Sequence, residues 1–450
     1  MTPPAEIRIL YLSQDPELIQ RQLNGEVITL AQALPLRDDV STDEITPVAI
    51  LSHYDDQLGD YAHTGTQCQG ILPIGKGALK AARFQVIVAG KRYGKGSSRE
   101  HSPTAEKMAG VQCIIAESFE RIYRQNADNI GLFTSTHFEL LETLKSLKHI
   151  PTTQLIEGRE PLAAAILSEG GLLPWGQRHL QTLQPTPAPA AVKAMSLFEK
   201  ILHRHQLTAP LTPRVPQQGE GMFVQAHWRF IHEYYTGMAA HMLHEHLGRP
   251  LRLHQPESIL VFEDHSSYMD ESPAHLKAGL VPHMRAMCQA QRDFAAAYGL
   301  KTHRTLTDLE AAQDDGSNVA GISHAMMSEH YALPGQVVVG TDSHTPHSGA
   351  LGCVAFGVGT TDMANAFVTG AVRVTLPECV RVELHGQLPA GVTAKDLMLH
   401  LLASPWIRQG NGIGKVFEFM GPGLARLSTD ERATLTNMCA ELGGLTGIVA

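Results

Sequence analysis

The sequence predicts an α/β protein of several domains, and three observations support this prediction. Short aliphatic and β-branched runs, which are typical of buried strands, alternate with longer helical patterns along most of the chain. The 450 residues exceed what a single hydrophobic core serves, so we expect two to four domains. Hydrophobic residues make up 43% of the chain and charged residues 18%, as in ordinary globular proteins.

The charge and the apolar segments exclude several classes of protein. The net charge is −9 and no basic stripe is present, which argues against a nucleic-acid binder but not against a protein that binds small anions. No run approaches about 18 apolar residues, so no membrane-spanning helix is expected. The N-terminus lacks the apolar core of a signal peptide, and we therefore expect a cytoplasmic protein.

The cysteines are scattered, without a C-x-x-C pair or another spacing typical of metal ligands. In a cytoplasmic protein such thiols are expected to be free and mostly buried. The sequence therefore predicts no metal ligands in this chain. The six are Cys68, Cys113, Cys288, Cys353, Cys379 and Cys439.

Residues 1–140 are predicted to form a small α/β domain. Strand candidates at Ile7–Leu12, Phe84–Ala89 and Cys113–Ala116 alternate with helical segments. A Gly-rich loop follows the second strand and leads into a helix that starts near Arg99. A strand, a Gly-rich loop and a helix start in this order resemble an anion-binding cradle.

The loop itself, GKGSSREHSP at 94–103, carries groups that suit an anion. Ser97 and Ser98 can cap the helix, whose first N–H groups would face the anion. The guanidinium of Arg99 pairs with a carboxylate or a phosphate in bidentate fashion. The alternative is an N-capped helix with a surface arginine, and for the motif alone both interpretations stay open.

A second part of the chain is predicted beyond a linker. The pattern loosens over residues 141–194, which include the Pro/Ala segment QTLQPTPAPAAV, and this segment should stay extended. From residue 195 onward helices again alternate with strands, and the texture changes near residue 380. We therefore expect a larger α/β domain at 195–378 and the start of another at 379–450. The expected elements are a helix at Met195–His205 and strands at Ser258–Phe262, Gln336–Val339 and Arg381–Leu384.

The stretch Val337–Asp362 is the strongest candidate for a functional site. Its strand ends on Gly340, and Asp342, Ser343 and His344 follow one after another. A strand that presents an acid, a hydroxyl and an imidazole at its C-terminal end is a common way for an α/β fold to build a site. The simpler alternative is a Gly-rich connection with an Asx-type turn.

Further acid and imidazole groups lie on both sides of this stretch. Each of these acid and imidazole groups, taken by itself, is more simply explained as a buried structural residue. The segment HMLHEH at 241–246 lacks closed metal-ligand spacing and is expected to be a solvated helix face. The candidates are Asp264-His265 after a strand, His324 in a short connection, the pair His232-Glu233, and Asn437 with Glu441, whose i, i+4 spacing predicts one helix face.

Taken together, the motifs resemble the aconitase and isopropylmalate dehydratase superfamily. VSTDEITP, YGKGSSREHSP and ESFERIYRQNADNIGL resemble its small swivelling domain. VFEDHSSY, GISHAMM, the long segment around GTDSHTPHSG, LPAGVTAKD and LTNMCAELGGLTGIVA resemble the first two domains of its large subunit. The resemblance implies an aconitase-like α/β fold, in which a swivelling β/α domain precedes three-layer α/β domains, with the site in the cleft between them.

The resemblance also implies a reaction and roles for residues. The reaction would be the reversible dehydration and rehydration of a hydroxy di- or tricarboxylate, such as a citrate-like or 3-isopropylmalate-like acid. Ser98 would remove a proton beside a carboxylate, while Ser97, Arg99 and His232 would bind substrate. The groups that protonate the departing hydroxyl would be Asp264, His265, His324, Asp342, Ser343 and His344, with Asn437 and Glu441 beside a 4Fe-4S cluster.

The family's cluster is held by cysteines in a G-S-C-T-N segment and a C-x-x-C, and neither segment is present in this sequence. Three explanations remain: a partner chain that carries the cluster, a continuation of this chain, or a cluster-free relative that only binds or regulates. The first is preferred, because the other site residues are present. We therefore expect an enzyme with a small polycarboxylate substrate and a second, cluster-bearing part, and no membrane or nucleic-acid partner.

Overall fold

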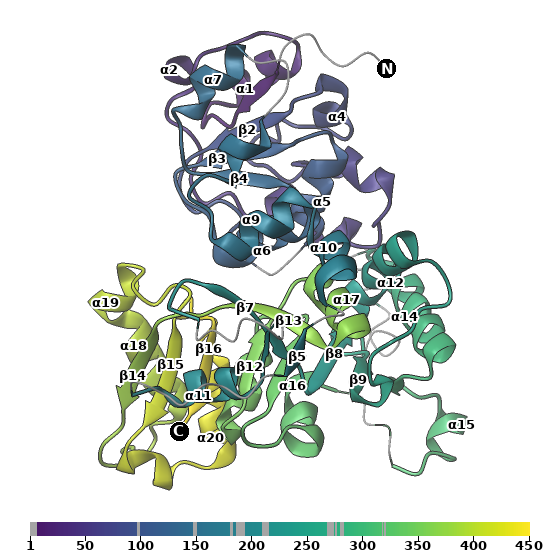
Figure 1. The fold of residues 1–450 in the computed structure, drawn as a ribbon, viewed down its shortest axis with the longest axis vertical. Coiled ribbons are helices and arrows are strands. Elements are labelled where there is room, and N and C mark those ends of the chain that lie inside the picture. Colours follow the sequence, from purple (N-terminus) through teal and green to yellow (C-terminus); the bar gives the residue numbers. More distant parts are fainter. Residues whose placement is uncertain are drawn as a thin grey trace. The chain divides into compact units, whose positions relative to one another are not determined.

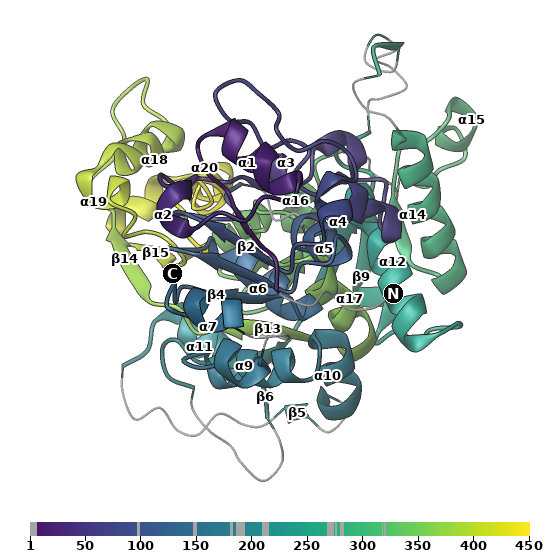
Figure 2. The same cartoon turned by 90° about the horizontal axis from the view of Figure 1, so that it is seen from above.

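The computed structural model describes residues 7–96, 100–146, 151–180, 183–185, 194–208, 216–267, 274, 277–279, 283–316, 318 and 321–450. The chain divides into two compact units, Met1–Trp175 with Leu280–His283, and Gly176–Gly279 with Met284–Ala450. Both are built from helices and mostly parallel sheets, which confirms the predicted α/β class (Figures 1 and 2). The finer division into four segments stays a prediction. Among the described helices, none has the length and apolar character that crossing a membrane requires.

The first unit is a four-stranded parallel sheet in the order β1-β2-β3-β4 with apolar side chains on both faces. Leu10, Ile87 and Ile114 pack on one face, and Val88 and Ile115 pack on the other. The predicted strands are confirmed with small shifts at their ends. The strands are β1 (Ile9–Tyr11), β2 (Val86–Ala89), β3 (Cys113–Ala116) and β4 (Phe133–Ser135).

Short helices surround this sheet. They are one to three turns long, and some begin at a capping side chain, as α3 does at Ser41 with a capping box. They are α1 (Pro16–Leu23), α2 (Leu30–Ala33), α3 (Thr42–Ile45), α4 (Ala78–Ala82), α5 (His101–Met108), α6 (Arg121–Ile130), α7 (Leu140–Ser146), α8 (Thr152–Leu155) and α9 (Pro161–Ser168), with 3-10 turns η1 (Val48–Ile50) and η2 (Asp56–Tyr61). The sequence boundary between the two units, at Trp175 and Gly176, falls within α10 (Leu172–His179).

Helix α5, which follows the predicted anion cradle, is anchored in the core through Glu106. This carboxylate is fully buried and accepts hydrogen bonds from the hydroxyls of Tyr93 and Tyr123. The Nε2 atom of His63 lies 3.0 Å from the same carboxylate. Burial raises the pKa of both tyrosines well above the ordinary value, so each hydroxyl keeps its proton and donates.

The second unit contains a five-stranded parallel sheet in the order β10-β9-β8-β11-β12. Helices α12, α14 and α17 cover one face, where the guanidinium of Arg229 donates to the Ala366 carbonyl at 2.8 Å. Met326 and Met327 cover the other face. The elements are β8 (Trp228–His232), β9 (Ile259–Phe262), β10 (Lys301–His303), β11 (Val337–Gly340), β12 (Val354–Gly357), α12 (Glu233–Leu247), α14 (Met284–Tyr298), α15 (Asp308–Ala311), α16 (Ser323–Met326), α17 (Thr360–Thr369), and η4, η5 and η6 (Pro256–Ser258, Met327–Tyr331 and Thr345–Leu351).

Two smaller sheets complete this unit. An antiparallel sheet has the order β13-β7-β6-β5, and a parallel sheet has the order β14-β15-β16 with α18 and α20 packed on it (Figure 1). The predicted helix near Met195 and the predicted strand near Arg381 are confirmed as α11 and β14. The elements are β5 (Gln184–Pro185), β6 (Gln206–Thr208), β7 (Gly221–Gln225), β13 (Ala371–Thr375), β14 (Cys379–Glu383), β15 (Val416–Met420), β16 (Thr446–Val449), α11 (Leu197–Arg204), α18 (Ala394–Ala403), α19 (Pro405–Arg408), α20 (Thr429–Asn437) and η7 (Pro422–Arg426).

A close backbone approach joins the large sheet to the last one. A Cβ atom added to Gly349, in η6, would lie 2.0 Å from the carbonyl oxygen of Gly447 in β16. Only glycine fits at position 349, because any side chain would collide with that backbone. The Thr446 hydroxyl also donates to the Ala355 carbonyl of β12. This approach holds α20 and the turn after it against η6, which matters for the site described below.

The Glu106 cluster gives a prediction about stability. Glu106→Ala leaves two buried tyrosine hydroxyls and an imidazole without their acceptor, so we expect the free energy of unfolding to fall by about 3–5 kcal/mol. Urea denaturation measures the change in the free energy of unfolding, and hydrogen exchange of the β2 and β3 amides gives a second measurement. The matched control is Glu117→Ala, an exposed carboxylate 4.0 Å from the Lys91 ammonium, which should change stability by about 0–1 kcal/mol. Equal effects of the two substitutions would show that the cluster does not stabilise the unit.

Candidate active site

Imidazoles from separate segments meet at the carboxylate of Asp342. Its Oδ1 atom accepts a hydrogen bond from Nε2 of His324 at 3.0 Å and one from the backbone N–H of His344 at 2.7 Å. Nε2 of His265 lies 3.7 Å from Oδ2. The structure thus brings together Asp342, His265, His324 and His344, which the sequence marked as candidates. Their positions along the chain alone did not show that they would be in contact.

The parallel sheet explains this convergence. His232 is the last residue of β8, Asp264 and His265 follow β9, and Asp342 follows β11. These strands are neighbours in the sheet, and their pairing aligns His232 with Phe262 and Gly340 with Phe230. Because the strands are parallel, their C-terminal ends share one edge, and the side chains that follow them lie close together.

His344 links this cluster to the last sheet of the chain. Its Nε2 atom lies 3.1 Å from Oε1 of Glu441, and its Nδ1 atom lies 3.3 Å from the Ser343 hydroxyl. Hydrogen bonds with Asp342 and Glu441 raise the pKa of His344 to about 10. The same contact with His344 lowers the pKa of Glu441. The imidazole is therefore a cation held between two carboxylates at neutral pH.

Asp342 is ionised for a related reason. Burial alone would raise its pKa, but the hydrogen bonds from His324 and His344 outweigh the burial and hold the pKa well below its usual range. His347 shows the opposite behaviour, because burial lowers its pKa to about 4. Its Nδ1 atom accepts a hydrogen bond from the Asn437 amide at 3.4 Å, which requires that nitrogen to be unprotonated. The site therefore contains a charged and a neutral imidazole three residues apart.

The prediction that Asn437 and Glu441 share one helix face is wrong. Helix α20 ends at Asn437 with Met438 as its C-cap, and Glu441 lies in the turns that follow. The helix cannot continue into β16, because Gly443 adopts a left-handed φ of 78° and the N–H of Gly444 bonds back to the Cys439 carbonyl at 2.9 Å. Both predicted side chains still reach histidines of the cluster, but from a helix end and a turn.

His232 and Glu233 form the buried floor of the site. His232 is 2% exposed, and its ring stacks on His265 with centroids 4.2 Å apart. Burial lowers the pKa of His232 well below its usual range, so the ring is neutral. Glu233 is 1% exposed and accepts a hydrogen bond from the backbone N–H of Asp264 at 3.1 Å, and burial raises its pKa.

Asp264 lies beside the cluster but points its carboxylate at a different partner. Its Oδ2 atom accepts hydrogen bonds from the backbone N–H of Ser323 at 3.2 Å and from the Ser323 hydroxyl at 2.5 Å. Ser323 is the first residue of α16, which carries His324. His324, predicted to lie in a short connection before a strand, lies in the four-residue helix α16 between β10 and β11, and Asp264 holds the start of that helix in place.

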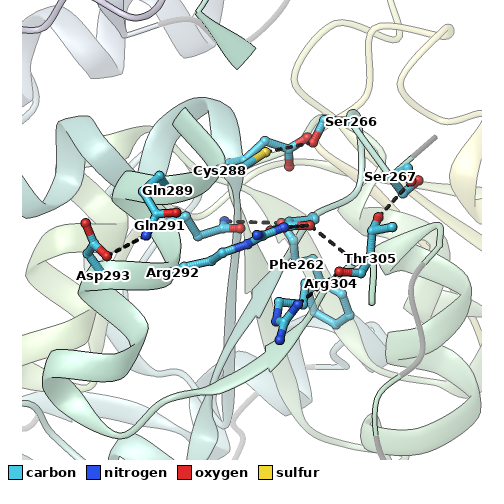
Figure 3. Close-up of polar contacts among 12 residues, drawn as sticks. Phe262, Ser266, Ser267, Cys288, Gln289, Gln291, Arg292, Asp293, Arg304 and Thr305 are labelled. Atoms are coloured by element: carbon cyan, nitrogen blue, oxygen red, sulfur yellow. Dashed lines mark hydrogen bonds and ion pairs between the residues drawn. The ribbon is translucent and has the colours of Figure 1, made fainter. Parts of the chain in front are cut away.

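A polar network braces the segment that carries Asp264 and His265 (Figure 3). The guanidinium of Arg292, on α14, pairs through two nitrogens with the buried carboxylate of Glu263. The backbone N–H of Thr305 donates to the same carboxylate at 3.1 Å, and the Thr305 hydroxyl donates to the Ser267 carbonyl at 2.7 Å. Gln291, fully buried, donates to the Phe262 carbonyl at 3.2 Å. The end of β9 is thus fixed on both sides of His265.

Sequence reasoning missed some of these residues. His347 carried a usable signal, since it follows His344 by three residues in the same Gly-rich stretch. Ser323 and Gln291 carried none, because their roles arise from distant partners. The predicted Ser97, Ser98 and Arg99 lie outside the described residues; helix α5 begins at His101 behind Glu100, whose side chain makes no capping hydrogen bond. In the HMLHEH segment, His244 contacts the Tyr298 hydroxyl at 2.9 Å, away from the Asp342 cluster.

The cysteines of the chain do not fit an iron–sulfur cluster. All six are free, and Cys353 and Cys439 are buried against backbone carbonyls of Leu333 and Leu435, at 3.0 and 3.3 Å. Burial raises the pKa of Cys353 to about 12 and that of Cys439 well above its usual value, which opposes the thiolate form that ligates iron. In the described part of the chain, no group of potential metal ligands includes a cysteine.

The charge on His344 can be tested by titration. Glu441→Gln replaces one of its two carboxylate partners with a neutral amide, so the pKa of His344 should fall from about 10 toward the ordinary 6.5. Because the pKa is raised in the folded chain, this contact stabilises the fold fully below about pH 6.5, and the stabilisation is lost as the pH rises toward 10. NMR titration of the imidazole in chelator-treated protein measures both values. Glu431→Gln, on a half-buried capping residue of α20, is the control, and an unchanged His344 pKa in Glu441→Gln would contradict the assignment.

Comparison with known proteins is consistent with this geometry. The profile of the aconitase family (aconitate hydratase) matches residues 199–450, and that of the aconitase C-terminal domain matches residues 69–138. The 3-isopropylmalate dehydratase large subunit 1 of Pyrococcus furiosus is 32% identical over 57% of this chain and 53% of its own length. The chloroplastic large subunit of Arabidopsis thaliana is 30% identical over 57% of this chain and 47% of its own.

A putative mitochondrial aconitate hydratase of Emericella nidulans is 42% identical over 29% of this chain and 16% of its own length. The chain therefore spans about half the length of the dehydratase large subunits that it matches. The first family profile covers more than half of the 450 residues, including every residue of the Asp342 cluster. The chain belongs to the aconitase family.

Proposed function

We propose that this chain is part of an aconitase-type hydro-lyase that dehydrates and rehydrates a hydroxy di- or tricarboxylate. The observation that carries the proposal is the convergence of three imidazoles on the carboxylate of Asp342, with ring nitrogens of His324, His344 and His265 at 3.0, 3.5 and 3.7 Å from its oxygens. Loss of a hydroxide from a carbon atom is slow in water, and a positioned acid that gives it a proton accelerates the step. The carboxylate of Asp342 holds several imidazoles in place, and an imidazole held in this way can serve as the acid.

The proposed acid side has two candidate proton donors. His324 directs Nε2–H at Oδ1 of Asp342, 3.0 Å away, and this hydrogen bond fixes the orientation of the ring. His344 sits between Asp342 and Glu441 and bears the positive charge that balances them. The neutral ring of His232 and the half-exposed ring of His265 would contact the substrate. Asp264 and Ser343 are assigned to the same side, where they hold His324 and His344.

The base side of the proposed reaction belongs to the loop around Ser98. Removing a proton next to a carboxylate creates negative charge, which a guanidinium and helix N–H groups stabilise. We assign the base to Ser98 and the binding of substrate carboxylates to Ser97 and Arg99, on the strength of the loop sequence GKGSSREHSP. A serine hydroxyl is weakly acidic, so it serves as a base only in such a cradle.

The proposal assigns the 4Fe-4S cluster to residues outside this sequence, in a second chain or in a continuation of this one. The support is indirect: the cysteines of this chain do not fit a cluster, while Asn437 and Glu441, which the family resemblance places beside it, contact His347 and His344. The second candidate is a cluster-free protein that binds a polycarboxylate without converting it, and the buried, separated thiols favour it.

Anaerobic purification from the native host separates the two candidates. If the chain is part of a hydro-lyase, iron and acid-labile sulfide should co-purify with a cluster-bearing chain or with a longer form of this one. The complex should then interconvert hydroxy polycarboxylates. A lone, iron-free chain that binds such acids without turnover would contradict the hydro-lyase and favour the binding protein.

The assignment of the base gives a further prediction. Ser98→Ala in the assembled enzyme should lower kcat by about 10²–10⁴-fold, because it removes the group that takes the proton, while the fold stays intact. Steady-state kinetics and circular dichroism measure the two effects. Ser168→Ala, which changes an exposed serine on α9, is the matched control and should leave kcat unchanged. Normal turnover of Ser98→Ala would remove Ser98 as the base.

A further inference from the structure

Three potential metal ligands lie together at the edge of the large sheet. One donor atom each from His232, His265 and Asp342 lies within 4.8 Å of the other two. The three residues come from the ends of β8, β9 and β11, which are neighbours in the sheet. Two imidazoles and one carboxylate form a ligand set that borderline divalent metals prefer, and three protein ligands leave coordination positions open.

The burial of His232 and its lack of hydrogen-bond partners are an independent observation that points to a ligand at this place. The side chain is buried, with 2% exposure, and neither ring nitrogen has a hydrogen-bond partner of normal geometry. The Thr341 backbone interacts with the ring, and Oε2 of Glu233 lies 3.9 Å from Nδ1, which is longer than a hydrogen bond. A buried polar group without a partner costs about 1–3 kcal/mol, and a metal bond would remove this cost.

The two oxygen atoms of the Asp342 carboxylate have different surroundings. Oδ1 accepts the hydrogen bonds from His324 and His344, whereas Oδ2 faces His265 at a distance of 3.7 Å, longer than a hydrogen bond. Oδ2 is thus available as a ligand while Oδ1 keeps its present partners. The hydrogen bonds at Oδ1 would act as supporting contacts that orient the metal-bound carboxylate.

The charge around this group also suits a cation. Oε1 of Glu233, another buried carboxylate atom, has no hydrogen-bond partner, and its residue adjoins His232. Asp342 and Asp264 add two further carboxylates. The imidazoles of His324, His344 and His265 face Asp342, and Ser323 faces Asp264. A divalent cation would compensate for carboxylates that lie in a poorly hydrated setting.

We propose that His232, His265 and Asp342 bind one divalent transition-metal ion, of which Zn²⁺ is the type example. Bonds of about 2.0–2.2 Å place the donors of a tetrahedral zinc site roughly 3.4 Å apart, so the donors would move together by about 1 Å. His265 can make this movement, because its side chain is 35% exposed and follows the end of β9. The proposal goes beyond the proposed function, since it requires neither turnover nor an iron–sulfur cluster.

Direct binding measurements on the full chain test this proposal. Chelator-stripped protein is titrated with Zn²⁺ in a calorimeter, and with Co²⁺ while its visible absorption is recorded. We expect one ion per chain and Co²⁺ bands of a site with nitrogen and oxygen ligands. His265→Ala and Asp342→Asn should each weaken binding by more than the roughly 10–100-fold that loss of a supporting residue causes.

The control is His246→Ala, which changes an exposed histidine on α12, and it should leave affinity and stoichiometry unchanged. Thermal melting in the absence of metal shows whether each variant is folded, and His265→Ala is the more informative one, because its ring is partly exposed. Absence of zinc binding, or equal affinity in wild type and in both ligand variants, would overturn the proposal. Because no activity is measured, either result leaves the hydro-lyase proposal to its own test.

Discussion

The second unit depends on one constraint, namely that the carboxylate of Asp342 is ionised in a largely buried place. Such a group must be paired and hydrogen bonded, because an unpaired buried charge is strongly destabilising. The required partners are His324 and the backbone of His344, so the carboxylate fixes α16 and the start of η6 relative to β11. Each partner is fixed in turn by another acid, His324 through the contact of Ser323 with Asp264 and His344 through Glu441.

The five-stranded sheet positions these charged groups, and a close backbone approach between Gly349 and Gly447 completes the arrangement. Parallel strands bring the ends of β8, β9 and β11 to one edge, which is why polar residues far apart in sequence become neighbours. The approach of Gly349 to Gly447 then presses η6 against β16 and α20. Without that approach the turn that carries Glu441 would not reach His344. The chemistry of the site therefore depends on packing between two sheets as much as on the site residues.

The sequence predicted what local pattern determines. β-Branched runs marked the strands, and polar residues directly after those strands, such as Asp264 and Asp342, marked the edge of the site. The features that depend on contacts between distant residues could not be predicted from local pattern. The i, i+4 spacing of Asn437 and Glu441 suggested one helix, but α20 ends at Asn437, and contacts with separate histidines place the two side chains. The grouping of His232, His265 and Asp342 as potential metal ligands could not be predicted for the same reason. These residues share no sequence motif and come together only through the order of the strands.

The most direct test of the account is a crystal structure of the chain soaked with a hydroxy tricarboxylate such as citrate. The account places the acid side of a hydro-lyase at the Asp342 cluster, so ligand density should lie within hydrogen-bond distance of His265, His324 or His344. Density at that place would tie the polycarboxylate to the imidazoles that are proposed to protonate its hydroxyl. Density confined to other surfaces at saturating ligand, with the cluster unchanged, would contradict the account and leave the imidazoles as a structural network.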